Sequence, residues 1–171
     1  MTGAEFIAKL LADGSPLGLR AGDGPEAAER AVPVGFLDVE EVPGASLRRD
    51  HGLLELSFSG GGETAGWTLS SGVLELHRLP LDPGPGTEWR EATGVDFAPY
   101  TAWSEVEAAL AAVPGHPEPV LELIHQGGYL EYRNPASGVS VLVVDDPDEE
   151  RDEWPGNGDV WSVGFGGTGK W

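Results

Sequence analysis

Two short runs of alternating apolar and polar residues constrain the fold of this chain more than any other feature. The runs cover residues 53–58 (LLELSF) and 73–79 (VLELHRL), with a Gly-, Ser- and Thr-rich passage between them. In the first run Leu54, Leu56 and Phe58 occupy every second position, which places them on one side of an extended chain. Alternation of this kind predicts strands with one face against a core, so we expect an antiparallel hairpin here.

The second half of the chain carries a reduced copy of this pattern. Residues 52–56 read GLLEL where residues 128–132 read GYLEY, and the triplet SGV occurs at both 71–73 and 137–139. We therefore predict a sheet built from two related hairpins.

Three further segments have the spacing of helices. Residues 2–13 begin with the capping-box pair Thr2 and Glu5, and a second box at 104–107 begins a helix that ends before Pro114. Residues 23–32 predict a short helix with a proline in its first turn, where a missing amide proton is tolerated. The remaining strands are predicted over residues 34–39, 120–126, 129–133, 139–144 and 159–165, and residues 120–126 would also fit a short helix.

This order of elements predicts an α+β fold: a mostly antiparallel sheet with helices packed on one face. We expect a single domain over residues 1–171, in which residues 1–79 and 100–171 form two related helix-plus-hairpin halves. The connection over residues 80–99 is rich in Pro and Gly, so we expect neither one continuous helix nor a central strand from it.

The net charge of the chain restricts the kinds of molecule that it is expected to bind. The chain has 29 acidic residues against 10 Lys and Arg, a formal net charge of −19. Nucleic acids and anionic membranes bind through cationic groups, so neither is an expected partner, whereas a basic protein is. The chain lacks cysteine, and no apolar run has the length of a membrane span. With no signal-peptide pattern at residues 1–14, we expect a cytoplasmic protein.

No catalytic motif is present. His51, His77, His116 and His125 lack metal-ligand spacing, although His51 and His125 would approach each other, near Asp50, if the two halves were related by a pseudo-two-fold axis. The sequence has no G-x-S-x-G motif, and the glycines at 60–62 and 164–169 lack the context of a phosphate loop. We expect no enzyme activity and predict no catalytic residue, no cofactor and no metal site.

The strongest candidate for a binding surface is the acidic run at residues 145–153 (DDPDEERDE), which lacks the pattern of a calcium loop. A solvated loop without function is the plain interpretation. Two tryptophans, Trp154 and Trp161, follow the run, however, and tryptophan beside charge is typical of binding hot spots. The predicted partner-binding residues are Asp145, Asp146, Asp148, Glu149, Glu150, Asp152, Glu153, Trp154 and Trp161.

Several stretches resemble a known class of protein: residues 48–58 (RRDHGLLELSF), 76–79 (LHRL), 135–144 (PASGVSVLVV) and 159–162 (DVWS). They are similar to small actinobacterial immunity proteins encoded beside secreted polymorphic toxins. The resemblance covers about two thirds of the chain and carries no catalytic signature. It implies a non-enzymatic inhibitor whose partner is a cognate toxin.

The sequence therefore favours a protein-binding protein, an immunity-type inhibitor that covers a basic toxin, such as a nuclease, with an acidic surface. Two alternatives stay open. One is a small-ligand-binding module or hydrolase that uses a cleft between the two halves. The other is a structural subunit of a larger assembly, which exposed apolar patches would indicate.

Overall fold

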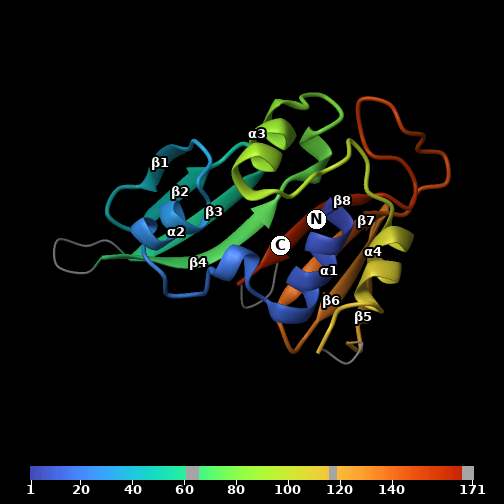
Figure 1. Ribbon diagram of the computed structural model, residues 1–171, viewed down its shortest axis with the longest axis horizontal. Helices are drawn as coiled ribbons and strands as arrows, with labels where there is room; N and C mark the ends of the chain where they lie inside the picture. The colour runs from blue at the N-terminus through green and yellow to red at the C-terminus, as the bar shows by residue number, and fades with distance from the viewer. Residues whose placement is uncertain (61–65, 116–118, 167–171) are drawn as a thin grey trace.

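A computed structural model describes residues 1–60, 66–115 and 119–166 (Figure 1). These residues form one eight-stranded sheet with the order β1-β2-β3-β4-β8-β7-β6-β5, and every neighbouring pair is antiparallel. The predicted α+β fold is confirmed. The strands are β1 (Leu37–Val42), β2 (Ser46–Asp50), β3 (Leu54–Gly60), β4 (Trp67–Leu74), β5 (Glu122–Gln126), β6 (Tyr129–Asn134), β7 (Val139–Val144) and β8 (Val160–Phe165). The helices are α1 (Gly3–Asp13), α2 (Pro25–Ala31), α3 (Gly84–Thr93) and α4 (Trp103–Leu110), with short 3-10 helices η1 (Pro16–Gly18) and η2 (Leu76–Arg78).

The sheet consists of two four-stranded meanders that meet at its centre. Strands β1 to β4 run inward from one edge and β5 to β8 run inward from the other, so that β4 pairs with β8. This central junction has three paired positions, Gly72 with Phe165, Val73 with Gly164 and Leu74 with Val163.

The sequence copies do not follow this arrangement. The matching segments fall on β3 and β6, and on β4 and β7, whereas the strands in equivalent places of the two meanders are β3 and β7, and β4 and β8. The relation between the two halves therefore stays a prediction.

Helices cover one face of the sheet (Figure 1). Helices α1 and α4 lie together over the half formed by β5 to β8, and α2 lies over the half formed by β1 to β4. The predicted inward positions Leu54, Leu56 and Phe58 are all buried beneath this layer, as are Val139 and Val141 from the opposite half. We call the other side of the sheet the open face. No helix within the described ranges is both long and apolar enough to cross a membrane.

The prediction of a strand over residues 73–79 is wrong at both ends. Strand β4 begins at Trp67, and it ends at Leu74 because the chain tightens into η2. There the Leu79 amide donates to the Leu76 carbonyl at 3.1 Å, which turns both leucines into the core. Two apolar residues three apart fit a 3-10 turn, where side chains at i and i+3 are aligned.

The Pro/Gly-rich connection contains a helix that the sequence did not predict. Helix α3 accommodates Pro85 in its first turn, where a missing amide proton has no cost. Its Trp89 is fully buried and makes edge-to-face contacts with Phe6 and Phe97, at centroid distances of 6.3 and 6.0 Å. These contacts fix the connection to α1 and the body of the domain.

Two other boundaries differ from the prediction. Helix α4 begins one residue before the expected cap, because the Glu105 carboxylate accepts a hydrogen bond from the Ala102 amide at 3.2 Å, so Ser104 is inside the helix. Strand β2 was not predicted, and the strand expected over residues 34–39 is β1, three residues further along. Strand β2 carries three consecutive charged residues, Arg48, Arg49 and Asp50, and every residue of β1 is exposed, so neither strand shows a clear apolar alternation.

Candidate functional site

The acidic run at residues 145–153, here called the acidic loop, is held to the sheet by an ion pair between a half-exposed arginine and a buried carboxylate. Asp159 is 1% exposed, at the start of β8, and its carboxylate accepts from Arg151 Nε at 2.8 Å and Nη2 at 2.6 Å. The same carboxylate accepts from the Gly156 amide at 3.1 Å. Arg151 also lies over the Tyr100 ring at 5.2 Å. One basic residue within an acidic run thus anchors the whole loop.

Short hydrogen bonds then fix the path of the loop. The Asp146 carboxylate accepts from the Asp148 amide at 3.1 Å, and the Asp152 carboxylate accepts from the Trp154 amide at 2.9 Å. The Asn157 amide donates to the Glu149 carbonyl at 2.9 Å. Carboxylates that bind amides two residues along define turns, so some acids here are structural and others are free for binding.

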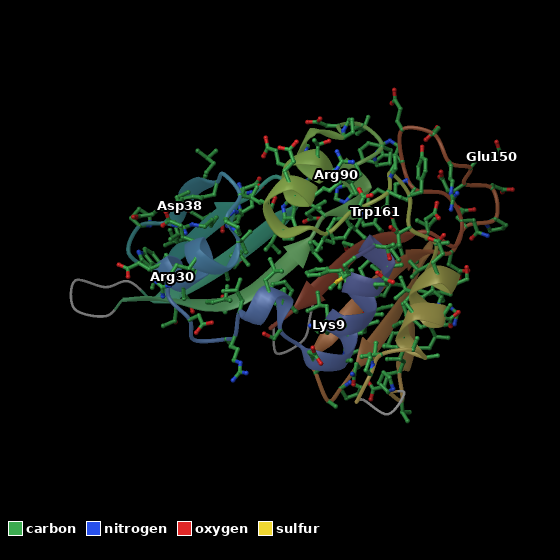
Figure 2. The ribbon with its side chains drawn as sticks, in the orientation of Figure 1. Lys9, Arg30, Asp38, Arg90, Glu150 and Trp161 are labelled. Carbon is green, nitrogen blue, oxygen red and sulfur yellow. The ribbon has the colours of Figure 1, made fainter. Side chains whose placement is uncertain are left out.

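The free acids point to solvent. All seven acidic residues of the loop are exposed except Asp146, which is half-buried. Across the described part of the chain, the carboxylates of Asp148, Glu150 and Glu153 take part in neither a hydrogen bond nor an ion pair. Figure 2 shows Glu150 on the outer part of the loop, directed away from the sheet.

Beside the acidic loop lies an aromatic cluster, defined as His77, Tyr129, Trp154 and Trp161. The His77 and Trp161 rings are stacked at 4.5 Å and are parallel within 4°. Trp154 is nearly parallel to Trp161 at 5.7 Å, and Tyr129 meets Trp161 edge-on at 5.6 Å. The four rings come from η2, β6, β8 and the end of the loop, so the β4·β8 junction is what assembles them.

Three of these rings and two carboxylates line a pocket of about 330 Å³, here called the aromatic pocket. Its walls include Tyr129, Trp154 and Trp161, with Asp146 and Glu149 at the loop side. Burial, and secondarily the negative charge of Glu149, raise the pKa of the Tyr129 hydroxyl. Trp154 is 42% exposed, so one wall of the pocket is open to an incoming group.

The open face has a second depression of about 210 Å³ between the two meanders, whose lining combines apolar residues such as Val73 and Leu142 with the polar side chains of Glu75, Gln126, Glu131, Ser140 and Ser162. The Glu131 carboxylate is 2% exposed and accepts from Arg133 and from Gln126, so its charge is already paired. Burial raises the pKa of Glu75, whose Oε2 lies 3.3 Å from His77 Nδ1.

The two-histidine site considered from the sequence does not form. His51 follows β2 and is 2% exposed, with Nδ1 3.1 Å from the Val34 carbonyl, whereas His125 is on β5 at the far edge of the sheet. The pseudo-two-fold argument failed because the two histidines precede strands in different places of their meanders. His116, Gly61, Gly62 and the glycines at 167–169 lie outside the described residues.

The structure brings some predicted binding residues together and adds two that sequence reasoning missed. Trp154, Trp161, Asp146 and Glu149 share the aromatic pocket, while the other acids surround it on the loop. Tyr129 and His77 were not predicted as part of this site. Tyr129 had a usable signal, since it follows a two-glycine turn and pairs with Val144, the last residue before the acidic run. His77 had none, because 84 positions separate it from Trp161.

None of the known family models, characterised proteins or solved structures with which the chain was compared matches it.

Proposed function

We propose that this protein binds a basic protein partner through the acidic loop and Trp154. The observation that carries the proposal is that the loop is anchored before any partner arrives. Because Arg151 and Asp159 already fix its path, a partner does not have to order the loop, and less binding energy is lost to conformational entropy. A half-exposed Trp154 at the end of a preorganised charged loop has the features of an interface hot spot.

Electrostatics supports the same partner chemistry. The exposed carboxylates of Asp148, Glu150 and Glu153 lie on one loop of a chain with net charge −19. Such a field accelerates association with a positively charged surface, and the acceleration falls as salt screens it over a length of about 8 Å at physiological ionic strength.

The finer proposal is that the partner is a toxin and that this protein is its immunity-type inhibitor. A nuclease fits best, since a site that binds phosphates is basic and a carboxylate surface can occupy it. Neither catalysis nor a cofactor is needed for this role, because covering the toxin's site is sufficient to block it.

The alternative is a small-ligand-binding module or hydrolase that uses the depression between the two meanders on the open face. The observation that favours it is that Glu75 lines the depression and lies 3.3 Å from His77, which is outside the lining. Burial raises the pKa of Glu75 and lowers that of His77. A fragment screen by NMR separates the two functions. Amide shifts confined to Val73, Ser140 and Ser162 would favour the depression over the acidic loop.

The direct experiment is to express this protein together with the product of the adjacent gene. We expect a tight complex whose affinity falls as salt rises, and rescue of growth when the neighbour is toxic. Absence of both would refute the proposal. The triple variant D148K/E150K/E153K should slow association at least tenfold at low salt and flatten its salt dependence.

A matched variant controls for total charge. Glu26, Glu29 and Glu40 are exposed acids on α2 and β1, at the opposite end of the sheet. E26K/E29K/E40K changes the net charge by the same amount as the loop variant. Equal effects of the two variants would show that overall charge, and not the acidic loop, governs binding.

A further inference from the structure

The aromatic pocket has the chemistry of a receptor for an organic cation. Tyr129, Trp154 and Trp161 present ring faces and edges around about 330 Å³, and Asp146 and Glu149 add negative charge at one side. Aromatic faces attract cations through the ring quadrupole, and nearby carboxylates reinforce that attraction. We propose that this pocket binds the guanidinium group of an arginine side chain from the protein partner. This inference rests on the proposed function and names the contact at its centre.

Ring geometry favours a guanidinium over an ammonium. Trp154 stacks on Trp161 within 22° of parallel and is 42% exposed, so it offers a flat surface to a bound group. A planar guanidinium stacks on such a surface while its N–H groups point outward in the plane, whereas an ammonium is a compact, strongly hydrated charge. Glu149 lines the same pocket, and its carboxylate can accept those N–H groups.

The chain uses the same combination for one of its own arginines. The Arg49 guanidinium lies 3.7 Å above the Phe36 ring, and it donates to both oxygens of Asp38 at 2.8 Å. An aromatic face and a carboxylate thus hold one arginine of the fold. The aromatic pocket repeats these parts on the surface.

The fold itself does not fill the pocket. Among the described residues that line it there is neither a lysine nor an arginine. Arg151, the one basic residue of the acidic loop, is directed to Asp159 instead. A cation for this pocket must therefore come from outside the described part of the chain, and a basic partner supplies one.

The test uses the full chain labelled with ¹⁵N at tryptophan, with Nα-acetyl-arginine amide as the probe. We expect the indole N–H resonances of Trp154 and Trp161 to shift and to saturate at millimolar probe. Trp89 and Trp103 are buried in the core and should not move. The matched control is Nα-acetyl-citrulline amide, which keeps the shape of the side chain and removes its charge. Equal shifts with both probes would overturn the proposal.

Variants locate the site within the loop. Glu149→Gln should weaken arginine binding two- to fivefold, while Glu150→Gln, an exposed acid outside the pocket, should leave it unchanged. Trp154→Ala should weaken it at least fivefold without unfolding the protein, because that side chain is 42% exposed. Nα-acetyl-lysine amide should bind more weakly than the arginine probe, and stronger lysine binding would contradict the guanidinium assignment.

The two proposals fail separately. Saturable arginine binding in a protein that forms no complex with the adjacent gene product would refute the proposed function and leave the pocket standing. A complex that E149Q does not weaken, in a protein whose Trp154 indole resonance does not shift with the arginine probe, would refute the pocket and leave the proposed function standing.

Discussion

The ion pair that anchors the acidic loop should show an asymmetric response to mutation. Arg151→Ala leaves the Asp159 carboxylate, 1% exposed, with the Gly156 amide as its remaining hydrogen-bond donor. Removing one partner of a buried pair costs about 3–5 kcal/mol when the other charge stays buried. Asp159→Ala instead leaves the Arg151 side chain, already 52% exposed, which water can solvate. We expect that variant to lose about 1.5–3 kcal/mol, the value of hydrogen bonds to a charged group, since it also leaves the Gly156 amide without its acceptor.

The double variant tests this asymmetry, because the second substitution should raise the free energy of unfolding of R151A and not lower it further. R151A/D159A removes the stranded carboxylate, so it should be more stable than R151A and close to D159A. Urea unfolding followed by circular dichroism measures the free energies of unfolding, and hydrogen exchange at the Asn157 amide reports local opening of the loop.

Arg90→Ala is the control, because Arg90 and Asp96 form an exposed pair at 3.8 Å whose loss should cost less than about 1 kcal/mol. Equal losses in R151A and D159A, or a double variant as unstable as the sum of the two, would refute the account of a buried anchor.

Two further predictions concern the same region. Burial lowers the pKa of His77 below its ordinary value of 6.5. Between that folded pKa and about pH 6.5, His77 is therefore more protonated in the unfolded chain than in the folded protein. The free energy of unfolding consequently decreases as the pH falls through this window. His77→Phe keeps a ring against Trp161, and the stability difference between wild type and variant should therefore change by up to about 1.4 kcal/mol per pH unit in that window. A difference independent of pH would exclude this titration. Gly156→Ala should destabilise the protein by about 1–3 kcal/mol in urea unfolding, because a Cβ there lies 2.7 Å from the Arg151 amide nitrogen. Gly35→Ala, with open space around its Cβ, should change stability by less than about 0.5 kcal/mol.

Local patterns predicted the strands and helices whose faces differ clearly in polarity. The alternation of Leu54, Leu56 and Phe58 identified β3, and the continuous apolar run of β7 identified a buried central strand. Patterns failed where side-chain burial depends on distant contacts. Nothing local indicates that Trp89 would bury a helix in a proline-rich stretch, because its partners Phe6 and Phe97 come from elsewhere in the chain.

Composition alone identified the acidic loop, but it did not predict that the loop has a fixed conformation. Order depends on the pairing of Arg151 with Asp159, two residues that sequence reasoning placed in different elements, a loop and a strand. In the composition of the run, one arginine among seven acids changes the net charge only slightly. In the structure that one arginine decides which acids are free to bind, because it fixes the backbone from which they project.

The aromatic pocket depends on topology rather than on any local pattern. Because β4 pairs antiparallel with β8, the end of β4 lies beside the start of β8, and His77 just after β4 reaches Trp161. The junction has three paired positions, so the stack of His77 on Trp161 extends the contact between the two meanders beyond the hydrogen-bonded ladder. The proposed arginine site is therefore built on the contact that joins the two halves of the sheet.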